Sequence, residues 1–431
     1  IKNIIFDGND AAIGNPATAG GSTGLLRILG EVSRIKVKSC GFTNARALGV
    51  NVTGSSGENR AKFINFTEDC WIDDVGEGIK IENCDHLTWD GGSMTNMQAQ
   101  DAWEPHGNCS HVKLKNVYLE GSGPGNCCIE IFPQIGNIRH ATVEDCHIVD
   151  NQMRISLGSG TGAGDFEVSD TVIRGNHFEH SIAYCGVNGK MTRTSFVRNH
   201  FEGNSNFADS AARPHSAIFL KSPSDGRNQY IGNQIDGYDG WGIYDSQDYG
   251  IAIGNQITDC WQNRDNLSGA RGGISWNDGG DGGVAIGNII QNVNGTTMVR
   301  GIESNTANSS WHIAGNLIDI PGDGLRFISA DSVYRVGNRY DTTRLVVTIP
   351  TGSSSVAIDR SLAGLSTSDN VNLFAQPLGS GNQTSSPMAP ATHAWFRRAG
   401  ADLYLQLDAA VTNDCDFLIF KIQTSPRIVQ P

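Results

Sequence analysis

The sequence has few charged residues and no long apolar segment. Of its 431 residues only 18% are charged, and 18 consecutive apolar residues occur nowhere, so we expect no membrane-spanning helix and no membrane partner. The formal net charge of -13 argues against nucleic acid as a partner, because phosphate recognition needs clustered Lys and Arg. A densely anionic substrate is also disfavoured unless its site is locally basic.

A secretion leader is missing as well. The chain opens at Ile1 inside a strand-like run, without a basic segment followed by an apolar core and a small-residue cleavage site. We therefore expect it to be a fragment of a longer protein.

The ten cysteines follow no metal-ligand spacing and suggest no disulfide framework. We interpret them as small apolar residues of turns and core, we predict no zinc site and no cofactor, and we make no prediction about redox chemistry. A Gly/Asp run from Asp278 to Gly283 resembles a calcium turn, but a single copy is weak evidence, so no metal is predicted.

Helical periodicity is absent, and a strand repeat takes its place. Short alternating strands end on Asn, Asp or Ser about every 27 residues, which is the signature of a solenoid. Asn tolerates the left-handed turn conformation, so we expect these residues to occupy one corner of each coil and to stack as a polar ladder. The closing positions are 39, 65, 90, 116, 145, 170, 199, 233, 255, 288, 316 and 338.

Such a unit is too short for a propeller blade, so the pattern predicts a parallel β-helix. The chain resembles the right-handed parallel β-helix proteins of the pectin lyase-like class over roughly residues 1–340. That class includes hydrolases, lyases, epimerases and binding proteins, so the resemblance implies a fold and leaves the reaction open.

From residue 341 to 431 the composition changes, and six runs are typical of antiparallel strands. We expect a separate β-sandwich that caps the last coil. Its order resembles bacteriophage tailspikes and tail-fibre depolymerases: a hairpin at Pro350, Leu362-Ala363-Gly364-Leu365, a strand with Trp395, and a closing Asp416-Phe417 strand. The resemblance implies a homotrimer held together by this module.

Four segments between Gly78 and Ser156 are similar to one another, and we expect them to stack as neighbouring strands. Strands alternate their faces, so Ile79, Trp103, Ile129 and Met153 should point inward together. The other face should form an outward polar patch of Lys80, Glu82, Glu104, His106, Glu130 and Arg154, with Asp74 and Asp101 in the loops before it.

An isolated outward Glu is usually only solvated, but carboxylates on consecutive coils repel one another and raise one pKa, which prepares an acid and a base together. Glu104 and Glu130 are our predicted catalytic pair, assisted by Glu82 and His106. His106 is equally compatible with a solvated ladder histidine. We expect Lys80, Arg154, Asp101 and Asp74 to contact substrate.

A second group combines aromatic rings and carboxylates on later coils. Trp241, Tyr244 and Trp276 are predicted to form a saccharide groove, because aromatic rings stack on the apolar faces of sugars. Trp276 and Asp245 fall on the inward face in this register, which is also compatible with core filling for Trp276. The chemistry could lie here instead, at Asp239, Asp245, Asp248, Asp278, Asp281 and Glu303.

The resemblance implies a virion tail protein that acts outside the host cell on a bacterial surface polysaccharide, a capsule or O-antigen. We expect an endo-acting glycoside hydrolase with paired carboxylates. The alternatives are a polysaccharide lyase, with Lys80, His106 or Arg154 acting on a uronic acid, and a non-catalytic receptor-binding spike.

Overall fold

A computed structural model gives the structure of the chain. With side chains it describes residues 1–8, 24–57, 60–99, 101–120, 127–149, 166–183, 190–203, 216–220, 226–260, 272–276, 282–293, 298, 300–304 and 311–320. It describes chiefly the backbone at 152–155, 184–185, 310, 323–327, 332–336, 339–340, 345–349, 355–358, 372–377, 394–399, 402–407 and 415–422.

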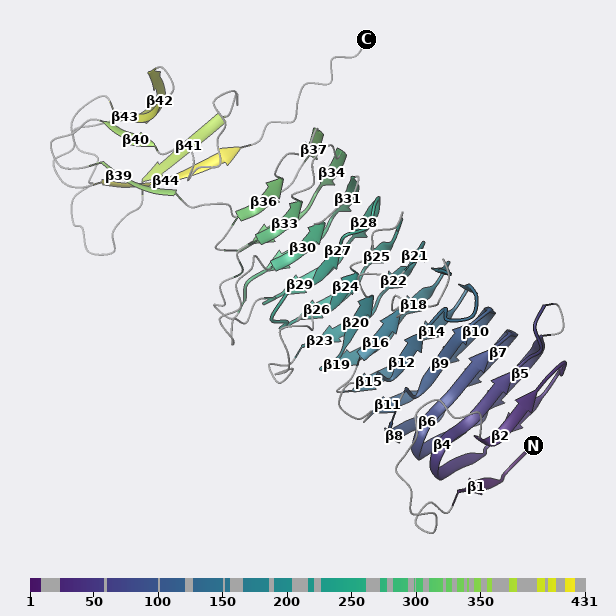
Figure 1. Cartoon of the computed structure of the whole chain (residues 1–431). Helices are drawn as coiled ribbons and strands as arrows, with labels where there is room; N and C mark the ends of the chain where they lie inside the picture. The colour runs from purple at the N-terminus through teal and green to yellow at the C-terminus, as the bar shows by residue number, and fades with distance from the viewer. Residues whose placement is uncertain are drawn as a thin grey trace.

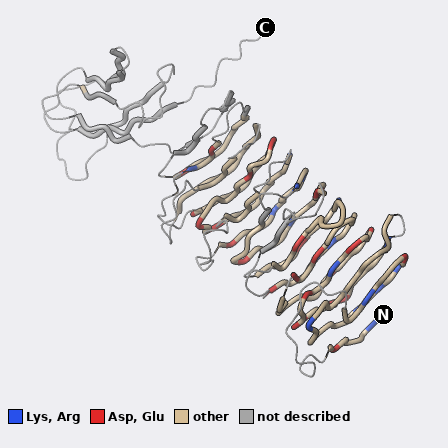
Figure 2. Tube along the Cα trace, viewed as in Figure 1, with Lys and Arg blue, Asp and Glu red and all other residues tan. Residues whose placement is uncertain are grey.

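The chain up to Tyr340 forms a parallel β-helix, as the repeat predicts (Figure 1). Each coil contributes strands to three parallel stacks, which we name sheets I, II and III, and its neighbours pair with it in register. Among the described residues no helix is long and apolar enough to cross a membrane. Charged residues of both signs are distributed over the coils (Figure 2).

Sheet I carries the polar patch predicted from the sequence. The long strands β4 and β6 pass from sheet II into sheet I and so join the two stacks. The strands of sheet I are β2 (Gly24–Leu29), the second halves of β4 (Gly41–Thr53) and β6 (Trp71–Glu82), β9 (Trp103–Gly107), β12 (Ile129–Ile131), β16 (Gln152–Ile155), β20 (Ile182–Cys185), β24 (Ile218–Leu220), β27 (Ile243–Asp245), β30 (Gly272–Trp276), β33 (Arg300–Ser304) and β36 (Asp323–Phe327).

Sheet II precedes sheet I within each coil. Besides the first halves of β4 and β6, its strands are β1 (Ile5–Asp7), β8 (Ser93–Met97), β11 (Tyr118–Glu120), β15 (His147–Val149), β19 (His177–Glu179), β23 (His200–Glu202), β26 (Gln234–Asp236), β29 (Gln256–Thr258), β32 (Ile289–Gln291), β35 (Leu317–Asp319) and β38 (Arg339–Tyr340).

Sheet III closes the prism. Its strands are β3 (Lys36–Lys38), β5 (Ala61–Thr67), β7 (Cys84–Asp90), β10 (Cys109–Lys115), β13 (Ile138–Arg139), β14 (Thr142–Glu144), β17 (Val168–Ser169), β18 (Val172–Arg174), β21 (Met191–Thr192), β22 (Ser195–Val197), β25 (Gln229–Ile231), β28 (Gly250–Ile253), β31 (Gly283–Ile286), β34 (Ser310–Ala314) and β37 (Ser332–Val336).

A buried asparagine ladder lines the corner between sheets III and II, as expected from the repeat. Each Asn from Asn176 to Asn288 donates from Nδ2 to Oδ1 of the Asn on the next coil at 2.8–3.0 Å. All six, Asn316 included, also donate to a backbone carbonyl of the preceding coil. Buried amides in a fully satisfied network fix the register of the coils. The ladder consists of Asn176, Asn199, Asn233, Asn255, Asn288 and Asn316.

Two details of the predicted repeat are wrong. At the ladder Asn the left-handed residue is the one before it, for example Arg198 or Gly254, while the Asn itself turns inward. At Ser39, Asn116 and Asp145 the predicted closing residue is itself left-handed, as expected. Asp170 belongs to a different bend within sheet III, where it aligns with His140 and Arg193. Its coil turns this corner at Gly175. The predicted Asn338 lies outside the described residues.

The six C-terminal strands pair in two three-stranded antiparallel sheets, close to the ranges predicted from the sequence. Whether these sheets pack as a sandwich, and whether the module holds three chains together, stay predictions. The strands are β39 (Leu345–Ile349), β40 (Ser355–Ile358), β41 (Asn372–Pro377), β42 (Ala394–Ala399), β43 (Asp402–Leu407) and β44 (Cys415–Ile422).

Candidate functional site

The inward and outward faces of the predicted site strands have the register that the sequence suggested. Ile79 pairs with Trp103, Trp103 with Ile129, and Ile129 with Met153. Ile79, Trp103 and Ile129 are completely buried in the apolar core. Glu104, the neighbour of Trp103, therefore belongs to the opposite face, where it lies beside Lys80.

The side chains on that face are far less exposed than expected. Glu104 is 5% exposed, His106 7% and Glu130 9%, whereas an open patch facing water was predicted. Strands one coil apart are separated by only about 4.8 Å, so polar side chains on successive coils cover one another. The solvent-facing edge of the group consists of Lys80 and Glu82, whose side chains are 17% and 21% exposed.

A β-bulge re-aims His106. Lys80 pairs with Glu104, but after Ile81 the register shifts, so that Glu82 lies opposite Gly107 instead of His106. Bulges turn a side chain away from the regular alternation. The imidazole contacts Glu104 through Nδ1 and Gln134 Oε1 through Nε2, and Nε2 lies 3.9 Å from Glu82 Oε1.

These contacts define where a proton resides. Gln134 Oε1 can only accept, so Nε2 of His106 carries the hydrogen, and burial lowers the pKa of His106, which favours the neutral ring. Nδ1 is then an acceptor, and Glu104 must donate to it as a carboxylic acid. In agreement, burial raises the pKa of Glu104 to about 7.

Glu77 is a further buried acid beside the predicted patch. It lies on β6, is 2% exposed, and neither oxygen makes a hydrogen bond of good geometry among the described residues. Burial first, and then the neighbouring Glu104 carboxyl, raise its pKa to about 9. Glu77 is therefore neutral at pH 7. The charged partner of Lys80 is Glu82, at 3.5 Å.

The predicted substrate contacts Asp101 and Asp74 are engaged elsewhere. Asp101 is buried and accepts hydrogen bonds from the backbone N–H of Cys127 at 2.9 Å and from its thiol at 2.7 Å. Asp101, Cys127 and Glu130 offer three ligand atoms within 4.8 Å of one another, a set that could hold a metal ion. Asp74 lies in the sheet II half of β6 and accepts a hydrogen bond from Gln98.

Arg154 pairs with Glu130 along the backbone, as predicted. Its side chain is outside the described residues.

The second predicted group does not form a saccharide platform. Trp276 is completely buried in the core and lies 5.0 Å from Trp311, ring centre to ring centre, so it has no free face. Trp241 is 6% exposed, and Tyr244 is 8% exposed and stacks on Phe219 at 4.6 Å. These rings are packed between neighbouring side chains, so they offer no exposed face to a sugar.

Asp245 is buried too, and its contacts are those of a structural carboxylate. It accepts hydrogen bonds from the Tyr230 hydroxyl at 2.6 Å and the Gln247 backbone at 2.9 Å, while burial raises its pKa to about 6. Glu303 is 5% exposed and lies 3.3 Å from Arg300. Asp278 and Asp281 lie outside the described residues.

Comparison with known proteins gives only distant likenesses. No family model matches the sequence, and no curated protein matches it. Solved structures to which the chain is similar include the tailspike of Escherichia coli bacteriophage HK620 in complex with a pentasaccharide, at 10% identity over 93% of this chain and 80% of that one, with a TM-score of 0.38.

Two further similar structures are a surface protein and adhesin of Streptococcus pneumoniae, PfbA, and a PL6 alginate lyase complexed with a trisaccharide. The first is 12% identical over 73% of this chain and 87% of the other, with a TM-score of 0.38. The second is 12% identical over 74% and 81%, with a TM-score of 0.30. Because these identities and TM-scores are low, the chemistry has to be argued from the side chains of this chain.

Proposed function

We propose that the chain is the polysaccharide-degrading part of a phage tailspike, which binds a bacterial surface polysaccharide and hydrolyses its internal glycosidic bonds. The observation that carries the proposal is the buried Glu104 carboxyl, whose pKa burial raises to about 7, lying against His106 with the Glu82 carboxyl on the far side of the same imidazole. Glycoside hydrolysis needs one carboxylic acid and one carboxylate around the scissile bond.

In this proposal Glu104 protonates the leaving glycosidic oxygen. Its pKa of about 7 suits an acid at neutral pH, and His106 orients it through the Nδ1 contact. Glu82 is the second carboxylate, in preference to Glu130, because it lies at the solvent-facing edge and is ion-paired with Lys80. It serves either as base for a water molecule or as nucleophile, depending on its distance from the bound sugar.

Glu77 then acts on Glu104 from the buried side, and Glu130 follows on the next coil. Glu77, neutral at pH 7, adds no charge, while it helps to exclude water from the acid. Lys80 lies at the solvent-facing edge of the group and contacts hydroxyl or carboxyl groups of the sugar. The homotrimer and the virion tail location belong to the same proposal.

A lyase is the second candidate, and the neutral His106 next to Lys80 favours it. Burial and the Lys80 charge lower the pKa of His106, as a base for proton abstraction from a uronic acid requires. Both ring nitrogens are already engaged by Glu104 and Gln134, so the ring would first have to break one contact. In hydrolysis the Glu104 proton must likewise leave His106 Nδ1, but a second carboxylate, Glu82, already lies 3.9 Å from the same ring, and we prefer hydrolysis.

The test is digestion of a panel of capsular polysaccharides and O-antigens by the chain, with analysis of product length and reducing ends. Hydrolysis yields oligosaccharides with new reducing ends and no absorbance near 235 nm, whereas a lyase produces that chromophore. Glu104→Gln and Glu82→Gln should abolish cleavage, and Glu130→Gln should weaken it.

A matched control is Glu120→Gln, which changes an exposed carboxylate of sheet II and should leave activity unchanged. Wild-type rates in both Glu104→Gln and Glu82→Gln would refute the site. If wild type cuts none of the polymers but retains one of them on a column, the receptor-binding alternative is favoured.

A further inference from the structure

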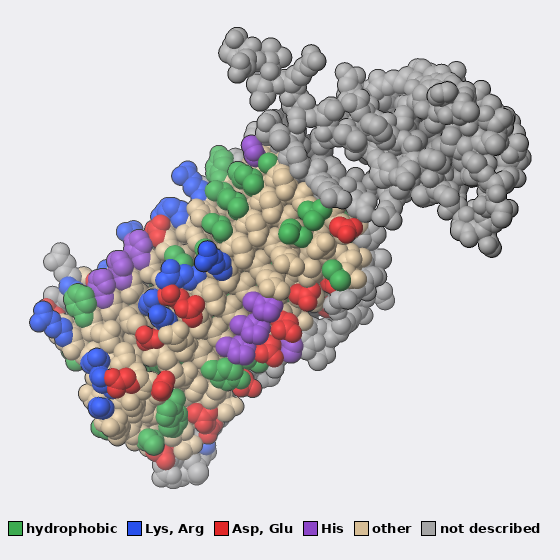
Figure 3. Space-filling model, turned by 180° about the vertical axis from the view of Figure 1, so that it is seen from behind, with side chains coloured by type: hydrophobic (Ala, Val, Ile, Leu, Met, Phe, Trp, Pro, Cys, Tyr) green, Lys and Arg blue, Asp and Glu red, His purple; other side chains and the backbone are tan. Residues whose placement is uncertain are grey.

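A row of histidines on sheet II stands apart from the carboxyl cluster of sheet I. The register of β11, β15, β19 and β23 brings Tyr118, His147, His177 and His200 to one position on four consecutive coils. Neighbouring imidazoles stack with ring centres 4.6 and 4.8 Å apart. Histidine side chains gather at two places on the face shown in Figure 3, and acidic side chains border one of them.

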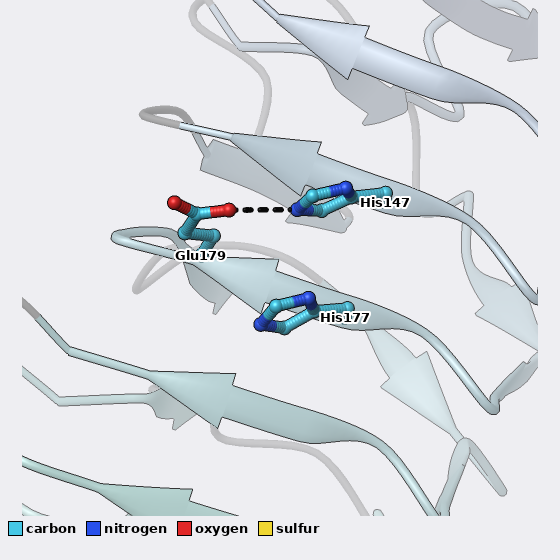
Figure 4. Close-up of side chains that lie close together, drawn as sticks. All are labelled: His147, His177 and Glu179. Atoms are coloured by element: carbon cyan, nitrogen blue, oxygen red, sulfur yellow. Dashed lines mark hydrogen bonds and ion pairs between the residues drawn. The ribbon is translucent and has the colours of Figure 1, made fainter.

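Carboxylates lie two residues after the histidine on β19 and β23. Glu179 aligns with Val149 on the coil before it and with Glu202 on the coil after it. Each carboxylate therefore lies diagonally opposite the histidine of the preceding coil. His147 Nε2 lies 2.8 Å from Glu179 Oε2 (Figure 4), and His177 Nε2 lies 3.4 Å from Glu202 Oε2.

One atom of this row has no satisfactory partner. His177 Nε2 is shielded from solvent, and it makes no hydrogen bond within the described part of the chain, since the approach of Glu202 at 3.4 Å does not complete one. Burying a polar nitrogen without a partner costs free energy, so an unsatisfied atom of this kind needs an explanation. Imidazole Nε2 is also among the commonest metal-ligating atoms in proteins.

The ligand atoms needed for such an ion are already close. His147, His177 and Glu179 each offer one, and the three lie within 4.8 Å of one another. Zinc binds imidazole at about 2.0–2.1 Å and carboxylate at about 2.0–2.2 Å, so a tetrahedral site requires ligand atoms roughly 3.4 Å apart. The side chains are 38%, 36% and 34% exposed, which leaves them room to rotate into that geometry.

We propose that His147, His177 and Glu179 bind one divalent transition-metal ion of the zinc type. Two imidazoles and one carboxylate, with a fourth position left to solvent, form a donor set that suits zinc. The ligands come from two successive coils, so the bound ion would link β15 to β19. Glu202 adds negative charge next to His177 but is not itself a ligand.

The experiment uses the full chain without a histidine tag, freed of metal by a chelator. Titration calorimetry with Zn²⁺ should give one ion per chain, and Co²⁺ should produce the visible absorption of a tetrahedral site. His147→Gln and Glu179→Gln should each weaken Zn²⁺ binding by about tenfold or more, because even groups outside the ligand shell alter metal affinity by about that factor.

His111→Gln is the matched control. His111 is likewise stacked, between His86 at 4.6 Å and His140 at 4.7 Å, but its ring nitrogen contacts the Ser110 hydroxyl instead of a carboxylate. This variant should bind Zn²⁺ like wild type. Zn²⁺ should also raise the melting temperature of wild type and His111→Gln and leave that of His147→Gln unchanged.

The proposal is wrong if wild type binds no Zn²⁺, or if His111→Gln reduces the affinity as much as His147→Gln does. Melting temperatures measured in chelator show whether each variant is folded. If one ligand variant fails to fold, the other decides the result.

Discussion

Replacing Glu77 by glutamine should stabilise the folded chain, and more strongly as the pH rises. Burial raises the pKa of Glu77 to about 9 in the folded chain, from an ordinary value of 4.5. A carboxyl group whose pKa is raised by folding favours the folded state fully below about pH 4.5. That contribution is lost as the pH rises toward 9, because the unfolded chain gains by ionising. Glutamine has the same shape and cannot ionise.

The size of the effect follows from the pKa difference. Each unit corresponds to about 1.4 kcal/mol, so at pH 7 the carboxyl group costs wild type about 3 kcal/mol relative to strongly acidic conditions. Between pH 5 and pH 8 wild type should lose about 4 kcal/mol of its free energy of unfolding through this group. Glu77→Gln should lack this loss, and near pH 5 its stability should approach that of wild type.

Urea unfolding followed by tryptophan fluorescence at pH 5, 7 and 8 measures the difference. Glu120→Gln, at an exposed position of sheet II, should run parallel to wild type at all three pH values. A difference between Glu77→Gln and wild type that stays constant from pH 5 to 8 would refute the reasoning. So would a Glu77→Gln chain that is less stable than wild type at pH 8.

Three further predictions concern other buried groups. Asn255→Ala should lower the free energy of unfolding by about 1–3 kcal/mol for each buried partner that loses its hydrogen bond. Gln256→Ala, at an exposed neighbouring position, should leave the free energy of unfolding unchanged. Equal effects of the two variants in urea unfolding would contradict the ladder's role. Tyr230→Phe removes the hydroxyl that donates a 2.6 Å hydrogen bond to Asp245, so the pKa of Asp245 should rise further above about 6. The free energy of unfolding at pH 8 should then fall by about 1–3 kcal/mol. An unchanged free energy of unfolding at pH 8 would argue against this hydrogen bond. His106→Gln should displace the alkaline limb of the cleavage rate, which Glu104 sets near pH 7; an unshifted limb would show that His106 does not orient the acid.

The sequence determined the architecture because the signal there is local and repeated. Because side chains alternate along a strand, Ile79 points inward. Pairing between coils aligns Ile79 with Trp103 and Trp103 with Ile129, so these two residues point inward as well. The Asn ladder was visible for the same reason, since Asn255 and Asn288 recur at one position of the repeat.

The tertiary structure alone decided what surrounds each polar group. A bulge of a single residue after Ile81 turned His106 toward Gln134, and no pattern in the chain announces such a shift. Glu77 and Glu104 became buried acids because strands of successive coils lie too close for water to reach both. The pKa of a carboxyl depends on the atoms around it in space, and those atoms come from coils about 27 residues apart in the sequence.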